Sequence, residues 1–190
     1  MDLTLFNKHA GIYISQLQYE EAEQLLTLRL RNRMAHQQYE PRYDEQFYTL
    51  EGQQQVLSRR LLEAQQDKAY MFGIYLLDGS LIGQITLSNI VSGVGQFADI
   101  GYFIDQELQG KGYMSAAVGL ILQFAFRALD LHRVQAAILV HNDRSRRVLE
   151  KNHFQPEGTA RGFIMINGEW QDHQTFAILA DELLSPRSEV

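Results

Sequence analysis

The chain has 190 residues, of which 45% are hydrophobic and 21% charged, a composition typical of a folded globular protein. A chain of this length buries roughly 70% of the surface that its unfolded form exposes, so its core needs no disulfide or metal. The 17 basic and 23 acidic residues give a net charge of -6. This charge argues against a nucleic-acid partner, because a basic surface supplies most of that affinity, and it would suit a basic substrate.

The chain contains no cysteine. This excludes disulfides, cysteine nucleophiles and thiolate zinc sites, and it favours a reducing compartment, so we expect a cytoplasmic protein. Residues Met1 to Gly11 hold charged side chains and no apolar run, so we expect no signal peptide. No stretch reaches the ~18 to 20 apolar residues of a membrane span, and no membrane partner is expected. The six histidines show no paired ligand spacing, so no metal is expected.

The first half of the chain predicts a strand, two helices and a meander. Ile12 to Leu17 alternates as a short strand, and Tyr19 to Arg33 has apolar residues at helical spacing. A second helix is indicated from Leu50 to Ala64. Tyr70 to Leu77 and Leu81 to Val91 then flank Asp78-Gly79, a pair typical of a hairpin turn, and a third strand follows at Ala98 to Ile104.

The second half predicts a strand–helix–strand unit and a final hairpin. From Gly112 the apolar stripe has helical period, and Val134 to Val140 alternates as a strand, which implies a right-handed crossover and a parallel strand pair. Asn142 to Lys151 indicates another helix, and Thr159 to Ile166 and Trp170 to Leu179 flank a hairpin turn. The predicted fold class is α+β, with a mixed, mostly antiparallel sheet, one central parallel strand pair and helices on both faces. No linker or repeat divides residues 1–190, so a single domain is expected.

The segment Gln109 to Met114 joins the strand Ile100 to Ile104 directly to a helix. Its two glycines lack a Cβ and let backbone N–H groups converge on a ligand, and the first turn of the helix adds free donors and the positive end of its dipole. Such a turn is suited to a phosphate. The alternative is an ordinary turn with Lys111 solvated at its tip.

Two known phosphate-binding loops do not fit this turn. The P-loop pattern needs an earlier glycine that the chain lacks, and a Ser or Thr where it has Gly112. The dinucleotide pattern needs a third glycine where Ser115 stands.

Gln109-x-x-Gly112-x resembles the Gln/Arg-x-x-Gly-x-Gly/Ala loop of the GNAT superfamily of N-acetyltransferases, except that Met114 occupies the last position. The longer segment from Ile100 to Ser115 is similar to the RimJ and RimL branch, which acetylates the N-termini of ribosomal proteins. In that branch, methionine or alanine is usual at the position of Met114. Two further segments resemble that branch: Asn142 to Phe154, where His153 replaces the usual glycine, and the hairpin from Gly158 to Leu179. The first ninety residues match only loosely.

The resemblance implies that acetyl-CoA is the co-substrate and that the amine attacks it directly, without an acyl-enzyme. It places the pantetheine arm along one strand, the pyrophosphate on the amides of the turn, and the thioester sulfur near the start of the following helix. The cofactor-binding residues that it implies are Tyr102, Phe103, Ile104, Gln109, Gly110, Lys111, Gly112, Tyr113, Met114, Ser115 and Asn142.

The resemblance also implies catalytic roles. In many relatives a tyrosine protonates the leaving thiolate, but Leu149 stands at that position, and Ser145 matches the serine proposed as the donor in the RimL-like branch. The alternative for Ser145 is a plain first-turn residue of a helix that Asn142 caps. A backbone N–H near Ile104 is the expected oxyanion donor.

The general base is not fixed by the resemblance, since Ile164 aligns with the RimL-like glutamate. Asp99 is the first candidate, and the others are Glu157, Asp172 and His173. An amine that binds already neutral needs no strong base.

The predicted function is transfer of acetyl to the N-terminal α-amino group of a protein such as a ribosomal protein. Two alternatives stay open: acetylation of a small amine (polyamine, aminoglycoside or amino acid), and a catalytically silent acyl-CoA-binding module. An aromatic cluster follows the first predicted helix and comprises Tyr39, Tyr43, Phe47 and Tyr48. In relatives this region shapes the acceptor pocket. The alternative is that these rings belong to the ordinary core. The chain is expected to act as a monomer or a homodimer.

Overall fold

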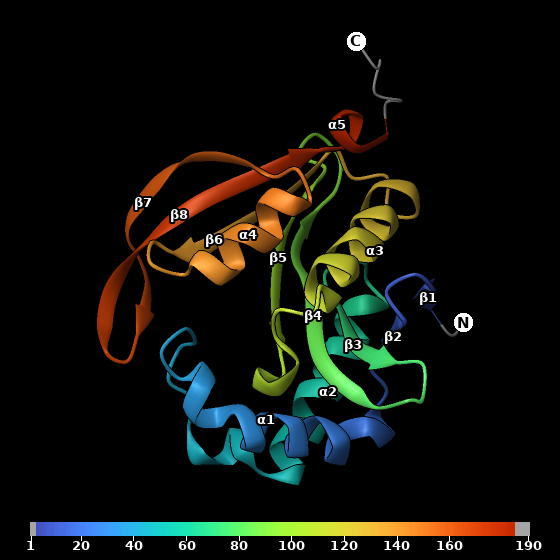
Figure 1. Ribbon diagram of the computed structural model, residues 1–190, viewed down its shortest axis with the longest axis vertical. Helices are drawn as coiled ribbons and strands as arrows, with labels where there is room; N and C mark the ends of the chain where they lie inside the picture. Colours follow the sequence, from blue (N-terminus) through green and yellow to red (C-terminus); the bar gives the residue numbers. More distant parts are fainter. Residues whose placement is uncertain (1–2, 185–190) are drawn as a thin grey trace.

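The computed structural model describes residues 3–184, which form one eight-stranded mixed sheet in the order β1-β2-β3-β4-β5-β6-β8-β7 (Figure 1). Neighbouring strands are antiparallel except β5 and β6, which are parallel. The strands are β1 Thr4–Asn7, β2 Ile12–Gln16, β3 Tyr70–Leu76, β4 Leu81–Val91, β5 Phe97–Ile104, β6 Arg133–Leu139, β7 Gln155–Ile166 and β8 Glu169–Leu179. The predicted sheet, with its one central parallel pair, is therefore confirmed.

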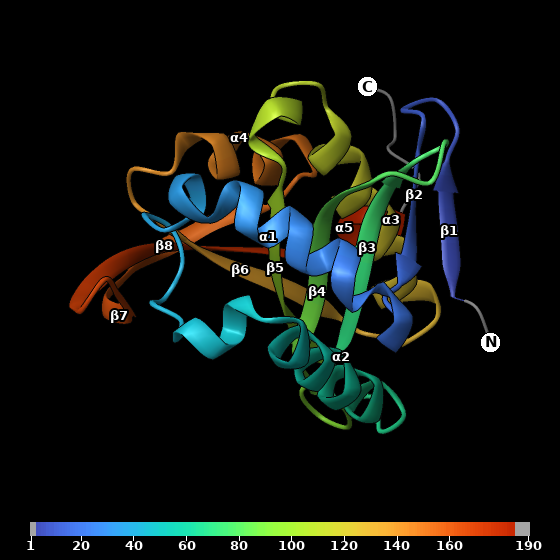
Figure 2. The same cartoon turned by 90° about the horizontal axis from the view of Figure 1, so that it is seen from below.

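Helices cover both faces of this sheet, as predicted (Figure 2). The helices are α1 Ala22–His36, α2 Leu50–Ala64, α3 Tyr113–Arg127, α4 Asp143–Lys151 and α5 Ala180–Leu184. Side chains alternate along β3, so that Phe72 packs into the core beneath α3 while Met71 and Tyr75 join Leu25 and Leu57 of α1 and α2 on the other face. Within residues 3–184, no helix has the length and apolar character needed to cross a membrane.

Strand β1 is the one strand that the sequence pattern did not predict. It pairs with β2 at the edge of the sheet, and Phe6 on it is 58% exposed. An edge strand with half-exposed side chains has little alternation of apolar and polar residues, so periodicity does not detect it. The final hairpin is also longer than predicted, because β7 begins at Gln155 and includes Pro156, which an edge strand tolerates.

The parallel pairing between β5 and β6 is very short. It joins only Phe97–Asp99 to Arg133–Gln135, whereas β6 pairs with β8 along its whole length. Beyond Asp99 the strands therefore separate, and Figure 1 shows β6 and β8 leaning away from β5. Residues 100–104 of β5 keep β4 on one side and have no strand partner on the other in the described part of the chain.

Buried polar contacts attach α1 to the turn after β5. The side chain of Asn32 is 1% exposed; its Oδ1 accepts the N–H of Gln106 at 2.8 Å, and its Nδ2 donates to the carbonyl of Leu28 at 2.9 Å. Next to it, the buried carboxylate of Asp105 pairs with Arg31. These contacts fix the entrance of the glycine turn relative to α1.

We expect Asn32→Ala to lower the free energy of unfolding by about 1 to 3 kcal/mol, because it leaves the N–H of Gln106 without its partner. Urea unfolding monitored by circular dichroism measures this change. Gln24→Ala, at an exposed position of the same helix, serves as the control and should change stability by less than about 0.5 kcal/mol. Equal midpoints for the two variants would contradict the assigned role of Asn32.

Candidate functional site

The glycine turn has the backbone geometry that the sequence predicted. Gly110 and Gly112 have φ angles of 78° and 85°, in the left-handed region that favours glycine. Gly112 is the N-cap of α3, and no side chain caps this helix. The first N–H groups of α3 are therefore available to an anion.

A cavity of about 860 Å³ begins at this turn and passes between β5 and β6. Its walls include Ile100 and Tyr102, which pack with the core beneath α3, and Phe103, which packs with the core of α1 and α2. The cavity therefore connects the two faces of the sheet through the gap where the strands separate.

The free edge of β5 faces this gap. The N–H of Asp105 donates to the carbonyl of Ile82 at 2.8 Å, toward β4. Because backbone groups alternate in direction along an extended strand, those of Tyr102 and Ile104 point to the other side. One of them is already used, since the carbonyl of Ile104 accepts a hydrogen bond from Nε2 of His36 at 3.1 Å.

Two hydroxyl groups meet at the wall of the cavity. The phenol of Tyr102 on β5 lies 2.8 Å from Oγ of Ser145 on α4. Burial raises the pKa of the Tyr102 phenol well above its usual value, so it stays protonated and can donate to Ser145. The hydroxyl hydrogen of Ser145 is then free for a ligand. Asn142 caps α4, since its Oδ1 accepts the N–H of Ser145 at 3.1 Å.

Most of the site residues predicted from the sequence line the cavity. These are Tyr102, Phe103, Ile104, Gln109, Gly110, Gly112, Tyr113, Met114, Ser115, Asn142 and Ser145. Lys111 is exposed and lies outside the lining, between two glycines that belong to it.

Asp99 also lies outside the lining. It sits where β5 and β6 separate, and each of its oxygens accepts an amide hydrogen, from Asn89 at 2.6 Å and from Gln135 at 2.7 Å. Its role as a general base stays a prediction.

Of the other predicted bases, only His173 lines the cavity. Glu157 is paired with Arg133 at 2.7 Å, and Asp172 accepts the N–H of Gly162 at 2.8 Å. The buried ring of His173 has Nδ1 3.0 Å from the carbonyl of Gln171, so Nδ1 is the donor and Nε2 is the ring nitrogen left for a ligand.

Polar residues from the first half of the chain complete the cavity, and the sequence patterns did not single them out. They are Arg29, His36, Glu40, Arg59, Arg60, Gln84, Thr86 and Ser88. Burial lowers the pKa of His36, which favours its neutral form. Only the aromatic cluster gave a sequence signal for this wall: Tyr39, Tyr43 and Phe47 line the cavity, and the rings of Tyr43 and Phe47 stack with centroids 3.9 Å apart. Tyr48 packs edge-on against Phe47 outside the lining.

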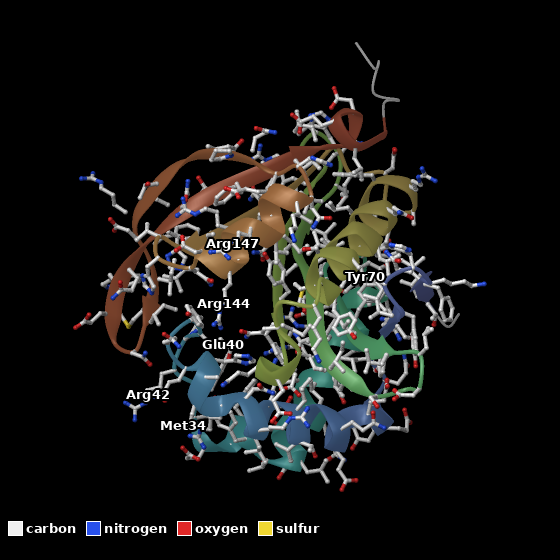
Figure 3. The ribbon with its side chains drawn as sticks, viewed as in Figure 1. Met34, Glu40, Arg42, Tyr70, Arg144 and Arg147 are labelled. Atoms are coloured by element: carbon white, nitrogen blue, oxygen red, sulfur yellow. The ribbon has the colours of Figure 1, made fainter. Side chains whose placement is uncertain are left out.

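Basic side chains line the part of the cavity beside α4. Arg144 donates from NH1 to Oε1 of Gln109 at 2.5 Å and so joins α4 to the glycine turn, and Arg147 and Lys151 lie on the same wall. Figure 3 shows Arg144 and Glu40 directed into the same gap from opposite sides, whereas Arg42 points away from it.

Comparison with known proteins agrees with this geometry. The family model for the acetyltransferase (GNAT) domain matches residues 12–155. The chain is 41% identical over 173 residues to the probable N-acetyltransferase YjcK of Bacillus subtilis (strain 168), which is 90% of this chain and 96% of that protein.

Two solved structures are similar over nearly the whole fold. The ribosomal-protein-S5-alanine acetyltransferase from Vibrio fischeri superposes with a TM-score of 0.90 at 29% identity, covering 96% of this chain and 99% of that one. Mycobacterium smegmatis RimJ in complex with CoA-disulfide has a TM-score of 0.88 at 30% identity, covering 92% and 85%. The predicted likeness to the RimJ and RimL type is confirmed, and the protein is an acyltransferase: the chain belongs to the GNAT acetyltransferase family.

Proposed function

We propose that the protein is an acetyl-CoA-dependent N-acetyltransferase that acts on the N-terminal α-amino group of a protein, with ribosomal proteins as the first acceptors to test. The observation that carries the proposal is the continuous cavity, which runs from the glycine turn through the gap between β5 and β6 to the aromatic cluster. Such a cavity can hold two substrates at once, one from each face of the sheet. That arrangement suits direct transfer, which needs no nucleophilic side chain.

The residues along the cavity fit acetyl-CoA in three respects. The amides at the uncapped start of α3 and the cations of Arg144, Arg147 and Lys151 suit its phosphates. The free backbone groups of Tyr102 and the N–H of Ile104 suit the amides of the pantetheine arm, which would pair as an added strand. The relative solved with CoA-disulfide supports the same ligand.

The amine attacks the acyl carbon of the acetyl-CoA thioester, so that a C–N bond forms and the C–S bond breaks. In the proposed mechanism Ser145 gives its hydroxyl proton to the leaving sulfur, and Tyr102, which stays protonated, stabilises the serine oxygen by a hydrogen bond at 2.8 Å until solvent restores its proton. Backbone N–H groups of β5 stabilise the oxyanion. Nε2 of His173 takes the proton of the amine, with Asp99 as the second candidate for this step.

The acceptor assignment rests on the relatives. The Vibrio fischeri protein is named for alanine acetylation of ribosomal protein S5, and the acceptor end of the cavity here is lined by aromatic rings and open to solvent, as a flexible protein N-terminus requires. The carboxylate of Glu40 at the same end favours a small cationic amine instead.

Gly112→Ala should weaken acetyl-CoA binding by about tenfold or more, a loss of about 1.4 kcal/mol, because a Cβ strains the left-handed backbone and shifts the amides of the turn. Gly79→Ala is the matched control: Gly79 has a φ of 87° in the hairpin between β3 and β4, and a Cβ meets nothing within 4 Å at either glycine. Each substitution should cost about 1 to 2 kcal/mol of stability. Titration calorimetry showing the same Kd for both variants and the wild type would refute the phosphate assignment.

Ser145→Ala should lower kcat by about 100-fold and leave the KM for acetyl-CoA nearly unchanged, because it removes the proton donor and not a binding group. Tyr102→Phe should have a smaller effect. The double variant should be no slower than Ser145→Ala, since Tyr102 acts through Ser145. Tyr70→Phe, which removes a phenol that binds Asp67 outside the cavity, should not change kcat.

These rates can be measured by release of the CoA thiol. The proton-donor assignment is wrong if Ser145→Ala binds acetyl-CoA and turns over at the wild-type rate. A wild-type protein that binds acetyl-CoA and releases no CoA with any amine would instead be the silent binding module.

The acceptor class can be identified by the same assay with N-terminal peptides, polyamines and aminoglycosides. We expect the highest kcat/KM for peptides with a free α-amino group and little release with an N-acetylated peptide of the same sequence. Preference for spermidine or an aminoglycoside over every peptide would replace the proposed acceptor with a small amine.

A further inference from the structure

Arg29 is a buried cation at the acceptor end of the cavity. It is 8% exposed, lies on α1 and forms part of the cavity lining. Its guanidinium carbon lies 4.8 Å from the ring centre of Phe47 and 4.7 Å from that of Phe103. Its NH2 donates to Oε1 of Gln84 at 2.7 Å, and Gln84 in turn donates to Thr86 at 3.0 Å. The guanidinium is therefore held in one position.

The donors of Arg29 are only partly used. The nearest carboxylate oxygen, on Glu40, is 4.0 Å from NH1, which is too long for a hydrogen bond. The enclosed Nε has no hydrogen-bond partner in the part of the chain that the structure describes. Burial lowers the pKa of the guanidinium, with Glu40 acting in the opposite direction, yet an arginine stays charged at neutral pH. A fixed and incompletely paired buried cation is costly in a purely structural role.

We infer that Arg29 binds the carbonyl oxygen of the first residue of the acceptor, and so selects the α-amine of a peptide over a polyamine. This inference rests on the proposed function. Arg29 contacts Phe103, which is next to Tyr102 in the sequence. If the α-amine of the acceptor lies in the gap beside Tyr102, the carbonyl group of the same acceptor residue would lie on the side of Arg29.

Charge decides among the other ligands. A polyamine has no oxygen to accept the N–H groups of NH1, and its second ammonium would meet a buried guanidinium of the same sign. A free amino acid would bring a full carboxylate close to Glu40, which lies 4.0 Å from Arg29. Arg59 and Arg60, which also line the cavity, are each paired with Glu63. A neutral amide carbonyl accepts the hydrogen bond without either repulsion.

The inference can be tested by comparing acceptors in the thiol-release assay, using the full chain. The acceptors are an alanyl peptide, L-alaninamide, L-alanine, isopropylamine and spermidine. In the wild type, the peptide and alaninamide should exceed isopropylamine and spermidine in kcat/KM. Arg29→Gln should reduce that ratio by about 10- to 100-fold, as expected for the loss of one hydrogen bond to a charged group, while Arg29→Lys should restore part of it.

Arg33→Gln is the matched control, since Arg33 is one turn further along α1, stacks on Tyr48 at 3.9 Å and lies outside the cavity lining. It should leave the ratio unchanged. A ratio equal in wild type and Arg29→Gln would overturn the inference, as would a wild-type preference for spermidine or for L-alanine over alaninamide. These wild-type measurements apply even if Arg29→Gln fails to fold.

A binding measurement separates failure of the inference from failure of the proposed function. The N-acetylated alanyl peptide keeps the carbonyl oxygen and has no amine to react. By calorimetry, it should bind the wild type about 10- to 100-fold more tightly than Arg29→Gln, whether or not any amine is acetylated. Equal affinity would overturn the role of Arg29 and leave the acetyltransferase proposal intact.

Discussion

The structure depends on one constraint, the brevity of the parallel contact between β5 and β6. β6 is hydrogen-bonded to β8 along its whole length, and β5 is bonded to β4 over most of its own, so each strand follows the twist of its own half of the sheet. The halves share a ladder of only three residues, Phe97–Asp99 with Arg133–Gln135, before they separate. The resulting gap exposes a strand edge inside the protein, where an edge is normally costly, and places the starts of α3 and α4 beside it.

The hydroxyl pair brings a phenol to α4 from a different element of the fold. Leu149, at the position where many relatives have a tyrosine, is completely buried in the apolar core and offers no proton. A phenol is nonetheless present at α4, because Tyr102 on β5 reaches Ser145 across the gap. Function is therefore better judged from the groups that meet in the cavity than from the identity of one aligned position.

The sequence predicted those features that are set locally. The glycine turn could be identified because Gly110 and Gly112 come directly before an apolar helix, and glycine permits the positive φ angles that both adopt. Asn142 could be identified as a helix cap from its position alone. The polar side chains that line the proposed acceptor end could not be predicted. Arg29 is hydrogen-bonded to Gln84, 55 residues away in the sequence, and His36 to Ile104, 68 residues away. No local sequence pattern around Arg29 or His36 indicates these partners.

Net charge was a poor guide to the cavity, because the local field there has the opposite sign. The chain carries -6 overall, yet the side chains around the cavity include several arginines and a lysine and a single carboxylate, that of Glu40. The cations near α4 lie beside the uncapped helix and the glycine turn, an arrangement suited to a polyanion. At the other end Glu40 lies 4.0 Å from Arg29, and Arg59 and Arg60 also line the cavity, each paired with Glu63. An overall acidic surface therefore does not require a basic acceptor, and the field at the acceptor end suits an uncharged amine with a polar neighbour.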